Sequence, residues 1–264
     1  MMKVTYLSHS GFLVECSGTS PEVCPVGQAD TEVWDKIYLL FDFYKGSLPQ
    51  MDKDAKLLAF ASHAHYDHFR KDIFDLLRPR GQVTFIVSDD VALEPAEDII
   101  FMGPGEEISI SGCSIRTLRS TDEGVAFLVM CAGHRIYHAG DLNWWHWEEE
   151  GQAYNTKMRR SYQQEINKLS GMEIDAAFIP VDPRLGDAYV KGLDCFMRRT
   201  NTKAVFPMHF WGNYGIFDRL ELEECTREYR DRICPIHREG QEFILEKKTE
   251  KTFQEYIREG GWSE

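Results

Sequence analysis

Short apolar runs separated by polar turns recur along most of the chain. The run Lys56-Leu57-Leu58-Ala59-Phe60-Ala61 is typical: it has the length of a buried strand rather than of a helix. The same pattern predicts strands near 3–7, 11–15, 37–42, 56–61, 83–87, 106–110, 113–119, 125–131, 134–138, 175–179, 203–207 and 241–246.

Other segments place apolar residues three or four positions apart, which is the spacing of one helix face. Phe69, Ile73, Phe74 and Leu77, for example, are apolar among charged neighbours. Residues 16–36 are instead polar and contain two prolines, so a hairpin insertion or a mobile loop is expected there. The spacing predicts helices near 69–77, 155–169, 188–199, 215–231 and 251–258.

This succession of elements predicts a mixed α and β protein. Strands dominate the first part of the chain, and helices alternate with strands afterwards. No linker rich in Pro, Gly or Ser and no repeat of fixed period interrupts the pattern. We therefore expect one domain over residues 1–264, with a helical insertion near 144–170.

Composition narrows the classes of function. The formal net charge of −13 at pH 7 disfavours binding to nucleic acid or to an anionic membrane. No apolar stretch reaches the length of about 20 residues that a membrane span needs. The seven cysteines are scattered, with no Cys-x-x-Cys pair, and the first residues form a predicted strand instead of a signal peptide. These features favour a cytoplasmic protein.

The densest concentration of chemically active side chains is the run His63-Ala64-His65-Tyr66-Asp67-His68. It follows one predicted strand and precedes a predicted helix. Alternate residues of an extended chain point the same way, so His63 and His65 can face one ion together. Asp67 and His68 lie beyond the turn and can face a second ion. Imidazole and carboxylate groups are together the ligands of zinc, iron or manganese.

The remaining donors must come from other parts of the chain. Asp141 follows the predicted strand at 134–138, and its carboxylate could bridge two ions. His209 follows the strand at 203–207, and His9 lies at the turn between the first two strands. Each of these three residues therefore stands at a strand end, where a site can assemble.

Taken in order, these motifs resemble those of the metallo-β-lactamase-fold hydrolase superfamily, in particular its branch of metal-dependent hydrolases related to ascorbate-phosphate lactonases. The resemblance spans residues 4–210 and implies a four-layer α/β/β/α sandwich in the α+β class. Its motifs are His9-Ser10-Gly11-Phe12-Leu13, Phe41-Asp42, the run from His63 to His68, His138-Ala139-Gly140-Asp141 and Pro207-Met208-His209.

The resemblance also implies a ligand set. His63 and His65 match ligands of a first metal, and Asp141 matches the bridging carboxylate. Asp67, His68 and His209 match ligands of a second metal. The family's third histidine of the first site is replaced here by Leu118-Arg119-Ser120-Thr121-Asp122-Glu123-Gly124, in which Asp122 is either an oxygen ligand or a turn residue before glycine. His9 is a further candidate donor, and one bound ion or two remain alternatives.

Several residues near these strand ends are candidates for shaping a pocket. The aromatic segments Asn143-Trp144-Trp145-His146-Trp147 and Phe210-Trp211 follow Asp141 and His209 closely, and either wall a pocket or pack the insertion on the sheet. Arg184 could bind a carboxylate or phosphate, or form a surface ion pair. Asp182 and Asp42 could orient metal-binding histidines through hydrogen bonds.

The leading hypothesis is a metal-dependent hydrolase in which a metal-bound hydroxide attacks a small-molecule ester, lactone or phosphodiester. Asp67 or Asp141 would position the water and help to move its proton, and His9 or Arg184 would anchor the substrate or protonate the leaving group. Zinc is the expected metal, with manganese or iron as alternatives. An anionic substrate is compatible with a metal centre and Arg184. A nuclease of the same fold and a non-catalytic binding or sensor protein are the rival hypotheses.

Overall fold

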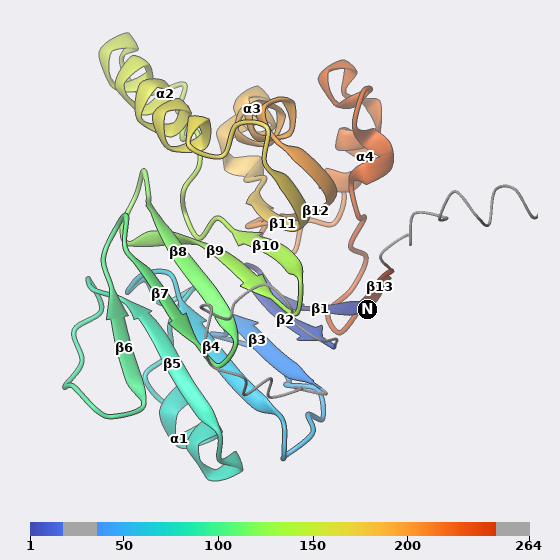
Figure 1. The fold of residues 1–264 in the computed structure, drawn as a ribbon. Helices are drawn as coiled ribbons and strands as arrows, with labels where there is room; N and C mark the ends of the chain where they lie inside the picture. The colour runs from blue at the N-terminus through green and yellow to red at the C-terminus, as the bar shows by residue number, and fades with distance from the viewer. Residues whose placement is uncertain (18–35, 247–264) are drawn as a thin grey trace, which may run out of the picture.

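The computed structural model describes residues 1–17 and 36–246 of the chain (Figure 1). Two β-sheets form its centre, with α1 beside one sheet and α2, α3 and α4 beside the other. The α/β/β/α sandwich predicted by the motifs is therefore confirmed. No helix among the described residues combines the length and the apolar character needed to cross a bilayer.

The first sheet has seven strands in the order β13-β1-β2-β3-β4-β5-β6. Strands β13, β1, β2 and β3 pair antiparallel, whereas β3, β4, β5 and β6 pair parallel. β6 was not among the predicted strands, because its four residues form too short a run to stand out. The strands are β1 (Met2–Ser8), β2 (Gly11–Cys16), β3 (Ile37–Phe41), β4 (Lys56–Ala61), β5 (Val83–Ser88), β6 (Ile99–Met102) and β13 (Glu242–Leu245).

The second sheet has six strands in the order β12-β11-β10-β9-β8-β7. Strands β7 to β10 form an antiparallel meander, and β10, β11 and β12 pair parallel. The strands are β7 (Glu107–Ile110), β8 (Cys113–Arg119), β9 (Val125–Cys131), β10 (His134–His138), β11 (Glu173–Pro180) and β12 (Asn201–Met208).

Two of the predicted helices are much shorter in the structure than in the sequence pattern. The helix expected at 69–77 is reduced to α1 (Ile73–Leu77), because the chain after His68 forms turns before it becomes helical. The helix expected at 215–231 ends as α4 (Ile216–Leu222), because Glu223 adopts an extended backbone. Short 3₁₀ turns at Glu224–Thr226 and Arg230–Arg232 follow it.

The other two described helices lie close to their predicted positions. α2 (Gln152–Asn167) connects β10 to β11, and α3 (Lys191–Arg199) follows a 3₁₀ segment at Pro183–Ala188. Further 3₁₀ residues, Arg78–Arg80, follow α1. The helix expected at 251–258 and most of the insertion expected at 16–36 lie outside the described residues.

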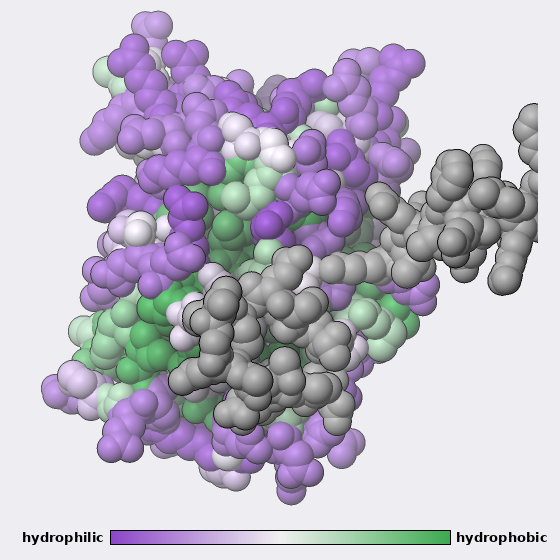
Figure 2. Space-filling model, viewed as in Figure 1, coloured by the Kyte–Doolittle hydropathy of each residue, from purple (hydrophilic) through white to green (hydrophobic). Residues whose placement is uncertain are grey.

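The apolar core is divided by the first sheet. β3 shows why: Ile37, Leu39 and Phe41 pack into the core between the sheets, while Tyr38 and Leu40 pack into a second core with α1. A strand buried on both faces needs a continuous apolar run, as in β3, whereas a half-buried strand alternates apolar and polar residues. Hydrophilic residues cover the surface over α2 and α4, and apolar residues show near β5 to β8 (Figure 2).

Seven of the strands that share one direction have carboxyl ends that carry residues of the site. β3 and β4 run parallel, and β1 shares their direction because it is antiparallel to β2. In the second sheet β10, β11 and β12 run parallel, and β8 shares their direction through β9. The loops that leave these strands carry the predicted metal-binding residues, so the topology itself assembles the site.

Candidate metal centre

Two groups of metal-binding side chains meet at this edge. The first donor group consists of His63, His65, Asp122 and Asp141, and the second consists of His9, Asp67, His68 and His209. Within each group the ligand atoms lie within 4.8 Å of one another. The structure thus brings together every residue that the sequence predicted as a metal ligand, and it places the further candidate donor His9 in the second group.

The first donor group lies at the solvent-facing side of the centre. His63 Nε2 is 3.0 Å from His65 Nδ1, and His65 Nδ1 is 3.6 Å from Asp122 Oδ2. The side chains of His65 and Asp122 are 43% and 44% exposed, whereas that of His63 is fully buried. Asp122 therefore lies within reach of the same ion as His63 and His65, and this group is the open side of the centre.

The second donor group is closed to solvent. His9 Nε2 and His209 Nε2 lie 3.4 Å and 3.9 Å from Asp67 Oδ2, respectively. His68 joins them with a fully buried imidazole. His9 comes from the β1–β2 turn, Asp67 and His68 from the loop after β4, and His209 from the end of β12.

Asp141 lies between the two groups. Its Oδ1 atom is 3.2 Å from His68 Nε2 and 3.4 Å from His209 Nε2, and its Oδ2 atom is 3.6 Å from His63 Nε2. Ligand atoms at the corners of a tetrahedron around zinc are about 3.3 Å apart, given zinc–nitrogen distances near 2.0 Å. The carboxylate of Asp141 is thus placed to bridge two ions.

The unsatisfied polar atoms show that the residues present fit a metal. Both ring nitrogens of His9, and the Nε2 atoms of His68 and His209, are buried without a hydrogen-bond partner, and so is Asp141 Oδ1. Buried polar atoms are nearly always hydrogen-bonded, because leaving them unpaired costs about 1–3 kcal/mol each. The Nε2 atoms of His68 and His209 lie 3.2 Å and 3.4 Å from Asp141 Oδ1, which is the arrangement expected around a cation.

Asp42 and Ser62 orient the two buried histidines of the strand-end loop. His68 Nδ1 donates to Asp42 Oδ2 at 2.8 Å, and Ser62 Oγ donates to the same oxygen at 2.7 Å. The Ser62 hydroxyl therefore accepts from His63 Nδ1, 3.0 Å away. Both histidines are left with an Nε2 lone pair directed at the centre, which is the tautomer a metal ligand needs.

Asp182 plays the same part for His209. His209 Nδ1 donates to Asp182 Oδ2 at 2.9 Å. The carboxylate is fully buried and also accepts hydrogen bonds of 2.5–3.0 Å from Nε and Nη2 of Arg184. The Asp182 carboxylate thus links Arg184 to His209, a member of the second donor group.

Backbone strain is concentrated around this centre. His9, Asp42, His209 and Trp211 have φ values of 53°, 41°, 62° and 54°. Left-handed backbone is unfavourable for residues with a β-carbon and is tolerated mainly at functional sites. These four residues are held in place by the surrounding strands, so their side chains are presented at fixed angles.

Two glycines allow the loops to approach one another closely. A β-carbon on Gly124 would lie 2.0 Å from the Ser62 carbonyl oxygen, and one on Gly140 would lie 2.6 Å from Ser62 Cβ. Both glycines have positive φ. The loop with Asp122 and the loop with Asp141 can therefore pack directly against the residue that precedes His63.

Charge interactions in the metal-free centre are strong. Burial lowers the pKa of His9 to about 4 and that of His63 to about 4, so both rings are neutral and available as ligands at neutral pH. Burial alone would raise the pKa of Asp67, but the nearby imidazole of His9 and the charge of His68 outweigh it and lower the pKa to about 2. Burial and the charge of Asp141 raise the pKa of Asp122, because two carboxyl groups share one small space.

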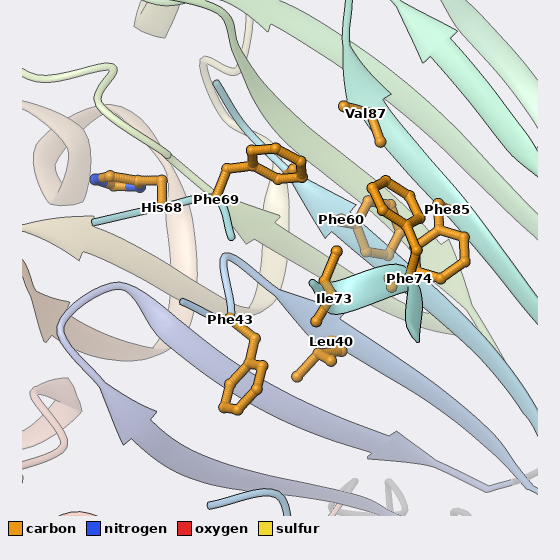
Figure 3. A pocket seen from close by; sticks show the side chains of 11 residues that line it. Leu40, Phe43, Phe60, His68, Phe69, Ile73, Phe74, Phe85 and Val87 are labelled. Carbon is orange, nitrogen blue, oxygen red and sulfur yellow. The ribbon is translucent and has the colours of Figure 1, made fainter. Parts of the chain in front are cut away.

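His138 is adjacent to the centre but does not face it. Its Nδ1 accepts from the Gly140 backbone, its Nε2 donates to the Ser10 carbonyl, and its ring stacks on Phe41. Behind His68, an apolar pocket lies between α1 and the first sheet, lined by Phe69, Ile73, Phe74 and neighbouring residues. The His68 imidazole points away from that pocket while Phe69 turns into it, so the pocket is part of the second core rather than of the centre (Figure 3).

Aromatic rings form one wall of the centre. The ring centroid of Trp145 is 5.5 Å from that of His209, and Trp145 stacks on Trp147 at 6.3 Å. Trp211 lies 4.4 Å from His9. The wall thus joins the two aromatic segments that the sequence placed after Asp141 and His209.

Three contacts of the centre were missed at the level of sequence. The sequence pattern did not single out Ser62, Glu123 or Tyr44, yet Ser62 links Asp42 to His63, Glu123 Oε2 lies 3.4 Å from His65 Nε2, and Tyr44 meets the His9 ring edge-on at 6.0 Å. The only available signal was that Ser62 directly precedes the histidine run.

Comparisons with known proteins agree with this geometry. No protein-family model matches the chain. A protein from Opitutus terrae described as a UPF0173 metal-dependent hydrolase is 28% identical over 262 residues, covering 89% of this chain and 95% of that protein.

Two solved structures share the fold over nearly the whole chain. Igni18, a metallo hydrolase from Ignicoccus hospitalis, has a TM-score of 0.56 at 18% identity, covering 93% of this chain and 99% of its own. The metallo-β-lactamase fold protein YhfI from Bacillus subtilis has a TM-score of 0.56 at 13% identity, covering 92% and 98%. The described residues therefore have the metallo-β-lactamase fold.

Proposed function

We propose that the chain is a metal-dependent hydrolase with the metallo-β-lactamase fold, and that it cleaves an ester, lactone or phosphodiester bond of a small molecule. The observation that carries the proposal is the pair of donor groups joined by Asp141, with buried unpaired nitrogens on His9, His68 and His209. The two groups would hold one ion each. Bound there, a divalent ion would acidify a water molecule and polarise the oxygen of the bond to be cleaved.

The protein's own groups would position and deprotonate the water. Asp67 Oδ2 lies 3.4 Å from His9 Nε2 and 3.9 Å from His209 Nε2, so its carboxylate would orient the water and accept the proton that the water gives up. Asp141 would hold both donor groups at a constant separation. Trp145 is buried beside His209 and would exclude bulk water from this side, which strengthens the polar interactions.

We propose zinc for the second donor group, because three imidazoles and one carboxylate are a typical zinc ligand set. The first donor group has two imidazoles and two carboxylates, and its exposed side allows additional water ligands. Manganese or iron is therefore the alternative for the first group. This assignment predicts that the two donor groups bind metal ions with different affinities.

The rival hypotheses have less support. A degenerate binding protein was suggested by the missing third histidine, but Asp122 Oδ2 lies 3.6 Å from His65 Nδ1 and is available as a fourth donor of the first group. A nuclease would have to attract a polyanion, and the chain carries a net charge of −13. We also propose a reducing cytoplasm as the location, because all six cysteines among the described residues are free thiols.

Metal content and hydrolysis, measured together, test the proposal. We expect about two metal equivalents in protein purified without chelators, and hydrolysis of at least one substrate class in a panel of p-nitrophenyl esters, lactones and bis(p-nitrophenyl) phosphate. His209→Ala should lose metal and activity, whereas His237→Ala, on the exposed surface, should keep both. A reconstituted protein without metal, or a metal-loaded one that binds metabolites but cleaves none of the panel, would overturn the proposal.

A further inference from the structure

Trp211 retains a large side chain at a backbone position that suits glycine. Its φ is 54°, and the next residue is Gly212, with a φ of 72°. The indole is also 40% exposed, so burial of apolar area does not account for its presence. Strained and exposed bulky residues gather where function requires them. The strained backbone and the exposure of Trp211 therefore indicate a functional role for its side chain.

The indole is held at a defined place beside the metal centre. Its Nε1 donates to Asp182 Oδ2 at 3.3 Å, and its ring lies 4.4 Å from the His9 ring and 5.5 Å from the His209 ring. The same Asp182 carboxylate accepts from His209. The Trp211 indole thus lies beside the second donor group, held by the same carboxylate that orients His209.

Arg184 completes this surface. Its guanidinium carbon lies 4.7 Å from the Trp211 ring centroid and 5.8 Å from that of Trp147. Nε and Nη2 donate to Asp182, but Nη1 makes no hydrogen bond to any residue in 1–17 or 36–246. The side chain is 51% exposed, so Nη1 can reach a ligand.

From this arrangement we propose that Trp211 and Arg184 form the substrate-binding wall of the centre, and that the substrate is a small organic anion with a planar group. Its carboxylate or phosphate group would accept from Arg184 Nη1, and its planar part would stack on Trp211. The inference rests on the proposed hydrolase function and adds the substrate class to it. Metal ions would offset the charges of Asp67 and Asp141 that otherwise repel an anion.

The alternative role for Arg184 is to position Asp182, and through it His209. The two roles differ in a measurable way. A positioning residue would change metal binding when it is removed, because Asp182 orients the metal-binding histidine. A substrate-binding residue would change anion affinity and leave the metal content unchanged.

Calorimetric titration of the zinc-loaded protein with simple anions tests the inference. Benzoate and phenylphosphonate represent the carboxylate and the phosphate class, and benzamide is the uncharged analogue. We expect one of the two anions to bind at least about tenfold tighter than benzamide, and Arg184→Gln to weaken that binding about tenfold or more. Trp211→Leu should reduce the advantage of benzoate over acetate, or of phenylphosphonate over inorganic phosphate.

Arg219 provides the matched control. Its guanidinium stacks on Tyr189 at 4.0 Å and its side chain is 42% exposed, but it contacts no residue of either donor group. Arg219→Gln should therefore bind the anions as the wild type does.

Two results with Arg184→Gln would overturn the inference: unchanged anion affinity, or loss of zinc from the variant, which would make Arg184 a positioning residue. Failure of the proposed function is distinguishable, because it would show as a wild-type protein that binds no metal. A zinc-loaded wild type that binds neither anion would contradict this inference alone.

Discussion

His68 and Asp42 share a hydrogen bond of 2.8 Å between Nδ1 and Oδ2, and neither side chain is exposed to solvent. Asp42 directly follows β3 with a φ of 41°, and its other oxygen accepts the Ser62 backbone N–H at 2.8 Å. The carboxylate therefore ties two neighbouring parallel strands together while it directs His68 Nε2 towards Asp141. Metal binding and the integrity of this strand end depend on the same group.

Asp42→Asn should weaken metal binding without abolishing the fold. The amide can no longer accept from His68, Ser62 Oγ and Ser62 N as an anion does, so the His68 tautomer is no longer determined. Loss of such a partner typically lowers metal affinity 10–100-fold. Competition with a chromophoric chelator would measure this, with Asp75→Asn on exposed α1 as the control. Equal affinities in the two variants would contradict the assigned role.

Asp122→Asn should change the metal stoichiometry. Asp122 supplies an oxygen 3.6 Å from His65 Nδ1 on the exposed side of the first donor group. A neutral amide is a weaker ligand there, so we expect about two equivalents to fall towards one. Elemental analysis after dialysis would show the change, and Asp187→Asn, at a fully exposed carboxylate, should keep the wild-type value. Two retained equivalents in Asp122→Asn would make Asp122 a turn residue only.

Gly124→Ala should destabilise the protein more than Gly81→Ala. Both glycines have a φ near 70°, so both substitutions carry a backbone cost of about 1–2 kcal/mol. Only at Gly124 would the new β-carbon meet the Ser62 carbonyl oxygen, at 2.0 Å, whereas nothing lies within 4 Å at Gly81. Overpacking adds about 1–3 kcal/mol at Gly124. Urea unfolding of both variants measures the difference, and equal losses would show that the loop moves freely.

The metal-free protein should lose stability as the pH falls from about 6.5 to about 4. His9 and His63 have a pKa near 6.5 when unfolded and about 4 when folded, because burial keeps them neutral. The unfolded chain then binds more protons, so the free energy of unfolding decreases on acidification, by on the order of 3 kcal/mol for each histidine. The pKa of His68 is raised by Asp141 and Asp42 in spite of burial, so its stabilising contribution is fully present below about pH 6.5 and is lost as the pH rises above that value.

Chemical denaturation at several pH values would measure this dependence. His9→Asn should remove part of the slope between pH 6.5 and 4, and His237→Asn, an exposed histidine, should leave it unchanged. A slope equal to that of the wild type in His9→Asn would mean that His9 is protonated in the folded metal-free protein.

Most strands could be predicted from the sequence, because a strand buried on one or both faces leaves a local pattern. The helix at 69–77 was predicted four residues too long, since its first turns form the loop that carries His68. The helix at 215–231 was predicted too long as well, because the apolar spacing continues past Glu223 although its backbone is extended. In both cases tertiary packing outweighed the local helical pattern.

For the candidate centre, the sequence by itself determined the residues that lie close together along the chain. The spacing of His63, His65 and Asp67 follows a single strand end, and the family motifs pointed to Asp141 and His209. Only the tertiary structure placed Asp122 within reach of His65 and brought His9 into the second donor group. The physical reason is that ligand geometry is a matter of a few ångströms, and for residues 9, 122 and 209 those distances depend on how the strands pair and how the two sheets pack.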